Sequence, residues 1–96
     1  MDKLIITVKE IKGNCPVYRI GDCIVLDEGY RMNLKETRNV CMHSLSSIMP
    51  YYIAIFRGVD PIKLGLSRDG ENAYIQCPDP CEYTGGGTVI FEMKKI

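Results

Sequence analysis

The sequence predicts an α+β domain of two layers, in which one helix packs on a mainly antiparallel sheet of four strands, in the order strand, strand, helix, strand, strand. Two observations predict this fold. Three segments alternate apolar and polar residues with the period of two that a half-buried strand needs, and a fourth is a short apolar run between turn residues. One central segment instead carries apolar residues at intervals of three and four, as an amphipathic helix does. Because 96 residues suit one modest core, residues 1–96 are expected to form a single domain.

The first two predicted strands lie in the N-terminal third of the chain. Residues 3–11 alternate as a strand does and are expected to end near Gly13; their apolar positions are Leu4, Ile6 and Val8. The cysteine–proline step at 15–16 takes the chain out of the sheet, because proline cannot donate to a strand ladder. A turn at 21–22 then introduces the second strand, a short apolar run over residues 23–26.

One amphipathic helix is predicted over residues 41–56. Its apolar residues form a single stripe, which comprises Cys41, Leu45, Ile48, Met49, Tyr52 and Phe56. Asn39 is expected to cap its first turn, and Gly58 is expected to end it. Pro50 lacks the N–H that would bond the carbonyl of Ser46, so the helix is expected either to kink there or to divide into two short helices.

The last part of the chain predicts two further strands. Residues 60–70 carry the turn residues of a loop, with a short helical turn at 62–66. The third strand alternates over residues 72–77 and ends before a proline. A flexible, glycine-rich connection at 84–87 leads to the fourth strand over residues 88–94, whose apolar face comprises Val89, Phe91 and Met93.

The charge balance excludes some classes of partner. Twelve Lys and Arg residues against twelve Asp and Glu residues leave no basic excess, so neither nucleic acid nor an anionic membrane is an expected partner. No apolar window approaches the roughly 18 residues of a membrane span, and the apolar run near the N-terminus is too short for a signal peptide. The protein is therefore expected in the cytoplasm, where its five cysteines would stay reduced.

Two cysteine motifs could carry chemistry, and each has a plainer interpretation. Cys77 and Cys81 bracket a Pro-Asp-Pro loop, a spacing close to the gap of roughly two to four residues in zinc clips; alternatively, the two thiols of this turn face different ways. Cys41 lies at the start of the predicted helix, where unpaired N–H groups favour a reactive thiolate. Alternatively, it continues the apolar stripe as a small buried side chain.

The sharpest hypothesis is that Cys15, Cys41 and Cys77 converge. Two of them precede a proline at the end of a strand, and the third opens the helix, so a suitable topology would bring all three together. Three thiolates suit zinc or an iron–sulfur cluster, with Cys81, Cys23 or solvent as the fourth ligand. Spacing along the chain cannot establish this convergence.

The other polar candidates are weaker. His43 is the only histidine, and two positions along a helix rotate it by about 200° from Cys41, which favours a solvated surface residue. An enzyme that uses Cys41 as nucleophile therefore lacks a visible base. Asp79 is most simply a hydrogen-bonding turn residue. The glycines at 85–87 precede a strand rather than a helix, which favours a hairpin loop over a phosphate-binding loop.

These motifs resemble a family of small bacterial and archaeal single-domain proteins whose activity is unassigned. The resemblance spans nearly the whole chain and rests on Cys15-Pro16, on a cysteine that opens the central helix, and on Cys77-Pro78-Asp79-Pro80 before the final strand. It implies that Cys15, Cys41 and Cys77 belong to the family pattern. Cys23 and Cys81 do not obviously belong to it, which favours the three-thiol site over the Cys77/Cys81 clip.

Two functions from different classes follow. The first is a small metal-binding or redox-active thiol module that uses Cys15, Cys41 and Cys77, with Cys81 as a further metal ligand. The second is a structural or interaction module in which the cysteines only fill the core. In that case an exposed strand edge or the helix surface recruits a protein partner or a second copy of the chain.

Overall fold

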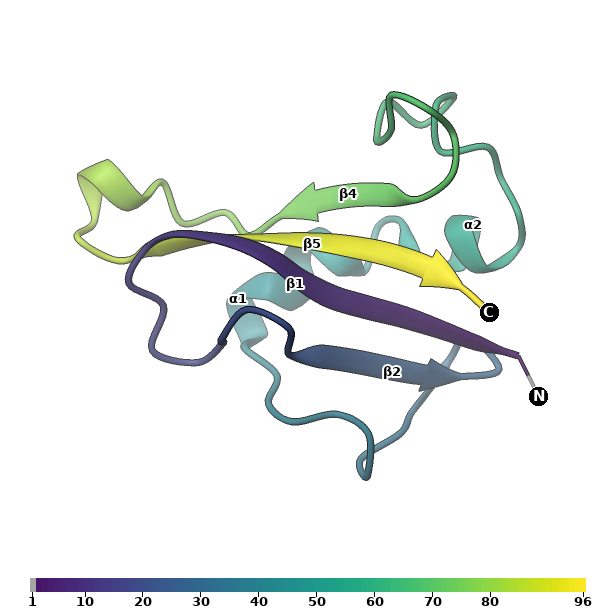
Figure 1. The fold of residues 1–96 in the computed structure, drawn as a ribbon, viewed down its shortest axis with the longest axis horizontal. Helices are drawn as coiled ribbons and strands as arrows, with labels where there is room; N and C mark the ends of the chain where they lie inside the picture. The colour runs from purple at the N-terminus through teal and green to yellow at the C-terminus, as the bar shows by residue number, and fades with distance from the viewer. Residues whose placement is uncertain (1) are drawn as a thin grey trace.

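The computed structural model describes residues 2–96 and confirms a small α+β fold built on an antiparallel sheet. Within these residues the sheet has five strands in the order β3-β2-β1-β5-β4 (Figure 1). The strands are β1 (Lys3–Gly13), β2 (Cys23–Asp27), β3 (Arg31–Met32), β4 (Ala73–Gln76) and β5 (Gly87–Lys95). Helices α1 (Met42–Ile48) and α2 (Tyr52–Phe56) lie behind the sheet in this view, and a 3-10 turn, η1 (Cys81–Tyr83), lies between β4 and β5.

A bulge lets β1 keep its apolar side chains on one face over its whole length. The alternation predicted at its start is confirmed, because the buried residues are Leu4, Ile6 and Val8. Between Val8 and Glu10 the register with β5 shifts, which leaves Lys9 as an extra residue outside the ladder. The shift changes the phase of the alternation and brings Ile11 against the core cluster.

The core lies between the sheet and the helices as one cluster of buried side chains. Its most deeply buried members include Phe91, Leu4, Ile6, Met93 and Val89. Tyr18, from the loop after β1, joins this cluster with 4% of its surface exposed. Its ring meets that of Phe91 edge-on, with ring centroids 5.4 Å apart and planes at 88°. The loop after β1 is therefore anchored on the centre of β5.

Pro50 divides the predicted helix into two. α1 ends at Ile48, and the Tyr51 N–H bonds the Ile48 carbonyl at 3.1 Å before α2 begins. The second of the two outcomes expected at this proline is thus confirmed, and the expectation of one continuous helix was wrong. Helices of seven and five residues would be unstable alone, so packing on the sheet holds them.

The sheet has one strand more than predicted. β3 is only two residues long, too short to show an alternating pattern. It pairs with β2 through a turn in which Glu28 and Gly29 both take the left-handed conformation, with φ of 57° and 80°. β4 covers residues 73–76 of the predicted strand at 72–77, and β5 extends the predicted strand at 88–94 by one residue at each end.

Two local predictions were wrong. Asn39 does not cap α1; its side-chain amide donates to the Val17 carbonyl at 3.4 Å, and the residue at the N-cap position is Cys41. Residues 62–66 form hydrogen-bonded turns rather than a helical turn, since the Gly65 and Leu66 N–H groups close back on Ile62 and Pro61.

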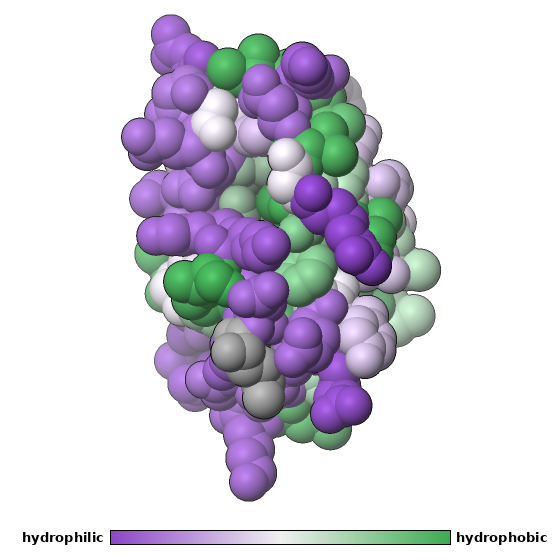
Figure 2. All heavy atoms as spheres, turned by 90° about the vertical axis from the view of Figure 1, so that its right-hand side faces the viewer, coloured by the Kyte–Doolittle hydropathy of each residue, from purple (hydrophilic) through white to green (hydrophobic). Residues whose placement is uncertain are grey.

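The surface around the two chain ends is mostly hydrophilic. Figure 2 shows this end of the molecule, where hydrophilic residues cover most of the face and hydrophobic ones form small separate patches between them. Scattered apolar residues of this kind are ordinary on a protein surface. None of the described helices has the length and apolar character needed to cross a membrane.

Candidate thiol pocket

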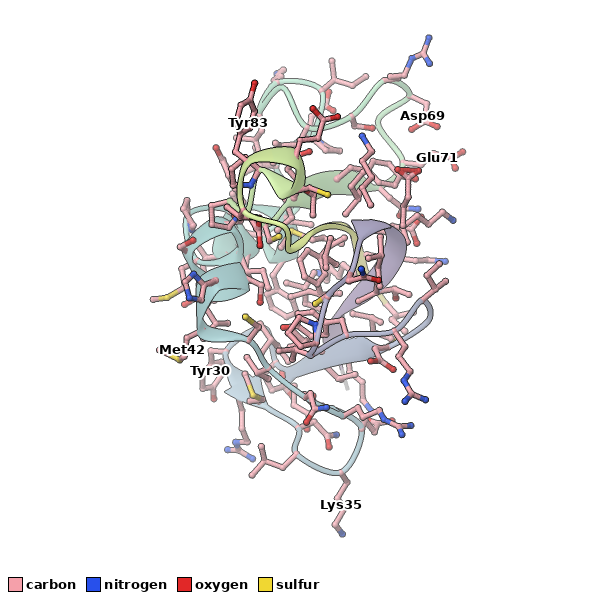
Figure 3. The ribbon with its side chains drawn as sticks, turned by 90° about the vertical axis from the view of Figure 1, so that its left-hand side faces the viewer. Tyr30, Lys35, Met42, Asp69, Glu71 and Tyr83 are labelled. Carbon is pink, nitrogen blue, oxygen red and sulfur yellow. The ribbon has the colours of Figure 1, made fainter. Side chains whose placement is uncertain are left out.

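Cys15, Cys41 and Cys77 line one pocket of about 180 Å³. They come from the loop after β1, the entry to α1 and the end of β4. The other residues around the pocket are Pro16, Val17, Tyr18, His43, Ser44, Asp79, Gly87 and Val89. Figure 3 shows this end of the molecule, where η1, which carries Tyr83, lies above α1, which begins at Met42. The topology therefore brings together the three segments that carry the predicted thiols.

A close approach of two backbones places Cys15. The Asn14 N–H bonds the Gly86 carbonyl at 3.1 Å, which ties the end of β1 to the start of β5. A side chain on Gly87 would lie within 3 Å of the Asn14 carbonyl and the Cys15 nitrogen, so only glycine fits there without movement of the backbone. The Tyr18 N–H then donates to the Cys15 sulfur at 3.4 Å and closes the turn.

Cys77 takes part in the ladder between β4 and β5 with its side chain. Its backbone N–H bonds the Val89 carbonyl at 2.9 Å, while its sulfur accepts the Val89 N–H at 3.2 Å. The thiol donates to the Gly87 carbonyl at 3.6 Å. With 7% of its surface exposed, Cys77 is the buried end of the pocket.

Cys41 is held by its backbone rather than by its thiol. Its N–H donates to the Tyr18 hydroxyl at 2.8 Å, and its carbonyl accepts the Ser44 hydroxyl at 2.7 Å. The hydroxyls of Tyr18 and Ser44 are themselves joined, and both side chains are buried. Cys41 itself is half-buried and lines the pocket, and its thiol is not needed for these backbone contacts.

The Tyr18 hydroxyl interacts electrostatically with the thiols of Cys41 and Cys15. Burial raises the pKa of its hydroxyl above the ordinary value, and the bonds with Ser44 and Cys41 partly offset that effect. Negative charge on Cys41 or on Cys15 raises the pKa of Tyr18 further. The tyrosine hydroxyl thus stays neutral beside both thiols and serves as a hydrogen-bonding group.

His43 and Asp79 supply a nitrogen and a carboxylate to the same pocket. His43 is exposed, as predicted, yet it lines the pocket that Cys41 also lines. The hydroxyl of Thr84, followed by the backbone N–H of Cys81, lowers the pKa of Asp79, and positive charge on His43 lowers it further. The expected turn role of Asp79 is confirmed by its bonds to Thr84 and Cys81.

Cys81 and Cys23 do not line this pocket. The Cys81 thiol donates to the Gly86 carbonyl at 3.5 Å and packs where a side chain on Gly13 would otherwise lie. Cys23 lies at the start of β2, with its sulfur 3.6 Å from the Thr7 hydroxyl oxygen. The structure therefore brings together three of the four predicted metal ligands and places Cys81 elsewhere.

The three thiols share a pocket without a preformed metal geometry. All five cysteines are free thiols. Over residues 2–96, no group of three or more His, Cys, Asp or Glu side chains has an arrangement that could hold a metal ion. Any ion would therefore require side-chain movement. The Cys41 thiol, for which residues 2–96 provide no hydrogen bond, can turn about its single torsion while the sulfurs of Cys15 and Cys77 keep their N–H donors.

Sequence reasoning missed the two hydroxyls that build this site. Tyr18 lies in a loop with no periodic signal, and Ser44 is a polar residue on the buried side of α1. The one available signal was the spacing of Ser44 three residues after Cys41, since serine and threonine at this distance can bond backwards to a carbonyl.

Comparison of the chain with protein-family models, with curated proteins and with solved structures gives no match. The resemblance to a family of small bacterial and archaeal proteins therefore stays a prediction.

Proposed function

We propose that this protein is a small thiol module whose pocket binds a thiophilic divalent metal ion, zinc in the first place. The observation that carries the proposal is that Cys15, Cys41 and Cys77, from three distant segments, line a single pocket. Thiolate sulfur is a preferred ligand of zinc, and three such ligands with one nitrogen make a common tetrahedral set.

His43 is the best candidate for the fourth ligand. It lines the pocket from α1, and neutral imidazole nitrogen is, after thiolate, the commonest zinc ligand. Asp79 lies close enough to interact with its charge and would accept the second ring N–H, as outer carboxylates do in many zinc sites. An iron–sulfur cluster fits less well, because it calls for four cysteines and Cys81 lies outside the pocket.

The hydrogen bonds at two of the sulfurs suit a metal-bound thiolate. On binding a metal, Cys77 would lose its proton and with it the bond to the Gly87 carbonyl. The N–H groups that Val89 gives to Cys77 and that Tyr18 gives to Cys15 would remain and would strengthen as the sulfur gains negative charge.

Metal analysis of protein purified without chelator tests this proposal. We expect close to one equivalent of zinc, released by denaturation together with three thiols that were protected in the folded protein. Cys15→Ser and Cys41→Ser should each weaken zinc binding by tenfold or more.

Cys23→Ser is the matched control, because Cys23 is also half-buried but lies outside the pocket. It should bind zinc like the parent. A protein that takes up no zinc, or a Cys23→Ser variant that loses as much affinity as the pocket variants, would overturn the proposal.

Thiol–disulfide chemistry is a second candidate, because Cys15 and Cys41 are both half-buried and line the same pocket. Glutathione disulfide would be the oxidant: the two sulfurs form one bond, and the disulfide takes their electrons and protons to become two glutathione molecules. Peptide mapping after this treatment should show a Cys15–Cys41 bond. Equal glutathionylation of Cys23 and the pocket thiols would refute this second function.

A further inference from the structure

β4 is an edge strand whose outer side is partly unpaired. The Cys77 N–H bonds the Val89 carbonyl, so the backbone groups at odd positions face β5. Those of Tyr74 and Gln76 then point away from the sheet. The Tyr74 N–H is used by the Leu66 carbonyl at 2.8 Å.

Three edge groups are left over: the Tyr74 carbonyl and both the N–H and the carbonyl of Gln76. None of them bonds another group within residues 2–96. The outward groups of Val25 on β2, beside the two-residue strand β3, are both occupied. The Val25 carbonyl accepts the Asn33 N–H at 2.8 Å, and the Val25 N–H donates to the Thr37 hydroxyl at 2.9 Å. The three free groups of β4 lie close together, on two residues that face the same way along one edge.

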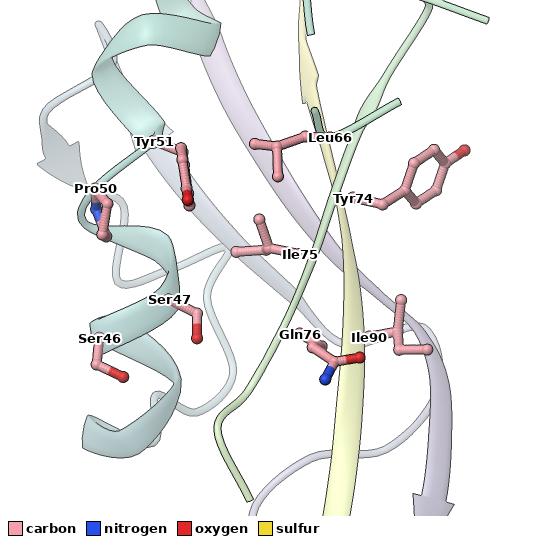
Figure 4. Close-up of a pocket in the computed structure, with 9 residues that line it drawn as sticks. All are labelled: Ser46, Ser47, Pro50, Tyr51, Leu66, Tyr74, Ile75, Gln76 and Ile90. Carbon is pink, nitrogen blue, oxygen red and sulfur yellow. The ribbon is translucent and has the colours of Figure 1, made fainter. Parts of the chain in front are cut away.

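A groove of about 490 Å³ runs beside this edge, between β4 and the helical segment. Figure 4 shows Tyr51 and Ile75 pointing into the space between them, with Ser47 nearby on α1, whereas Tyr74 points away. The lining residues carry no charge at any described position. The groove therefore suits uncharged side chains, and three consecutive residues of β4, Tyr74, Ile75 and Gln76, line it.

We propose that the β4 edge binds an extended peptide segment of a partner protein by strand addition. The backbone of the segment would bond Gln76 and the Tyr74 carbonyl. Its alternate side chains, uncharged and apolar, would enter the groove over Tyr51 and Ile75. This gives main-chain bonds for affinity and a groove for selectivity, independently of the thiol pocket.

A free peptide fits this site better than a second copy of the chain. The inward side chains of β4 are Ala73 and Ile75, and both are buried in their own core, with 0% and 7% of their surfaces exposed. A second β4 paired at the edge would keep those side chains in its own core and leave the groove empty. A segment without a core of its own has its alternate side chains available to fill it.

Nuclear magnetic resonance of the labelled full chain tests the proposal with four capped hexapeptides. Each peptide alternates two residue types: Val and Thr in the first, Ile and Ser in the second, Leu and Gln in the third, and Phe and Thr in the fourth. At least one should shift the amide signals of residues 46–49, 51 and 74–77 and slow hydrogen exchange at Gln76. The same peptides with alternate prolines lack the necessary N–H groups and should not bind.

Two matched variants separate strand addition from other binding. Gln76→Pro removes the edge N–H and should weaken binding tenfold or more, whereas Gln76→Ala keeps the backbone groups and should bind like the parent. Ser47→Trp fills the groove from the helix side and should also abolish binding, which keeps the test valid if the proline variant unfolds. The proposal fails if no peptide binds at millimolar concentration, if the shifts fall elsewhere, or if the chain dimerises through β4 instead.

Discussion

The hydroxyl oxygens of Tyr18 and Ser44 lie 2.7 Å apart in the core, and the bond between them runs in one direction. Ser44 has a single hydroxyl proton, which it gives to the Cys41 carbonyl. Tyr18 accepts the Cys41 N–H, so its own proton must go to Ser44. The result is a closed ring that begins and ends on the backbone of Cys41. Through it, two buried hydroxyls fix the residue that opens α1 beside the pocket.

Tyr18→Phe should therefore destabilise the protein by about 1–3 kcal/mol, because it leaves the Cys41 N–H and one bond of Ser44 unpaired in the interior. The edge-on packing of the ring against Phe91 would remain, so little of this loss would come from packing. Urea unfolding followed by circular dichroism measures the change.

Tyr74→Phe is the control for the same chemical change at the surface. The hydroxyl of the exposed Tyr74 donates to the half-buried Glu92 carboxylate at 3.1 Å, and its removal should change the free energy of unfolding by less than about 0.5 kcal/mol. Combined with Ser44→Ala, the Tyr18→Phe change should cost less than the sum of the single changes. Equal effects of the two tyrosine changes would show that the hydrogen bonds among Tyr18, Ser44 and Cys41 contribute nothing to the free energy of unfolding.

The hydrogen bonds among Tyr18, Ser44 and Cys41 also explain which part of the site could be predicted from the sequence. Cys15, Cys41 and Cys77 were found because cysteines beside prolines and at a helix start are visible in the sequence. Their partners were not visible, because Tyr18 reaches Ser44 only through the fold. The position of Cys81 was unpredictable for the same reason. Its thiol packs beside Gly13, a contact fixed by the path of the β4–β5 connection rather than by spacing along the chain.

The fold was predictable wherever a pattern was long enough to repeat. β1 and β5 alternate over many residues, and Pro50 leaves a clear mark in the helical stripe. β3 has only two residues and no pattern. The glycines were visible in the sequence, but their structural roles were not. Whether a glycine is needed for a positive φ or for a close approach of two backbones depends on neighbours that are distant in the sequence.

Gly29→Ala tests one such glycine. Gly29 has a φ of 80°, and a side chain there would collide with the ring of Phe56 in α2. Backbone strain of about 1–3 kcal/mol is expected from the conformation alone, and overpacking adds about 1–3 kcal/mol. Thermal unfolding should therefore show a large loss of stability.

Gly21→Ala separates the two causes. Gly21 has a similar φ of 93°, but a side chain there would meet nothing within 4 Å. It should show the strain without the collision and lose clearly less stability than Gly29→Ala. Equal losses at the two positions would mean that the turn before β3 can move away from Phe56 at little cost.

Asp69 should make stability depend on pH on the acid side. The Glu71 N–H, followed by the Ser67 hydroxyl, lowers its pKa below the ordinary value of 3.8. A lowered pKa in the folded state means that the carboxylate stabilises the fold above the unfolded value. This stabilisation is lost as the pH falls through the folded value. The melting temperatures of the parent and Asp69→Asn should differ at neutral pH and approach each other as the pH falls below the ordinary value of 3.8 and then through the lowered folded-state pKa.

Ser67→Ala provides the second measurement for this loop. It removes one donor to Asp69 and the acceptor of the Gly70 N–H, but it leaves the carboxylate in place. It should reduce the pH-dependent part of the stability without abolishing it. A difference between the parent and Asp69→Asn that does not shrink at any pH down to acid unfolding would contradict this account.

Gly87→Ala connects the fold with the chemistry of the pocket. The new side chain would press on the Asn14 carbonyl and the Cys15 nitrogen, so the loop after β1 must move away from β5 and carry the Cys15 thiol with it. We expect iodoacetamide to alkylate Cys15 faster in this variant, as followed by mass spectrometry of the Cys15 peptide. Gly85→Ala strains the same connection, at a φ of 73°, but meets no atom within 4 Å. It should lose stability by about 1–3 kcal/mol while leaving the alkylation rate of Cys15 unchanged. If the rate rises equally in both variants, general loosening of the β4–β5 connection controls access to the pocket, and the close approach at Gly87 does not.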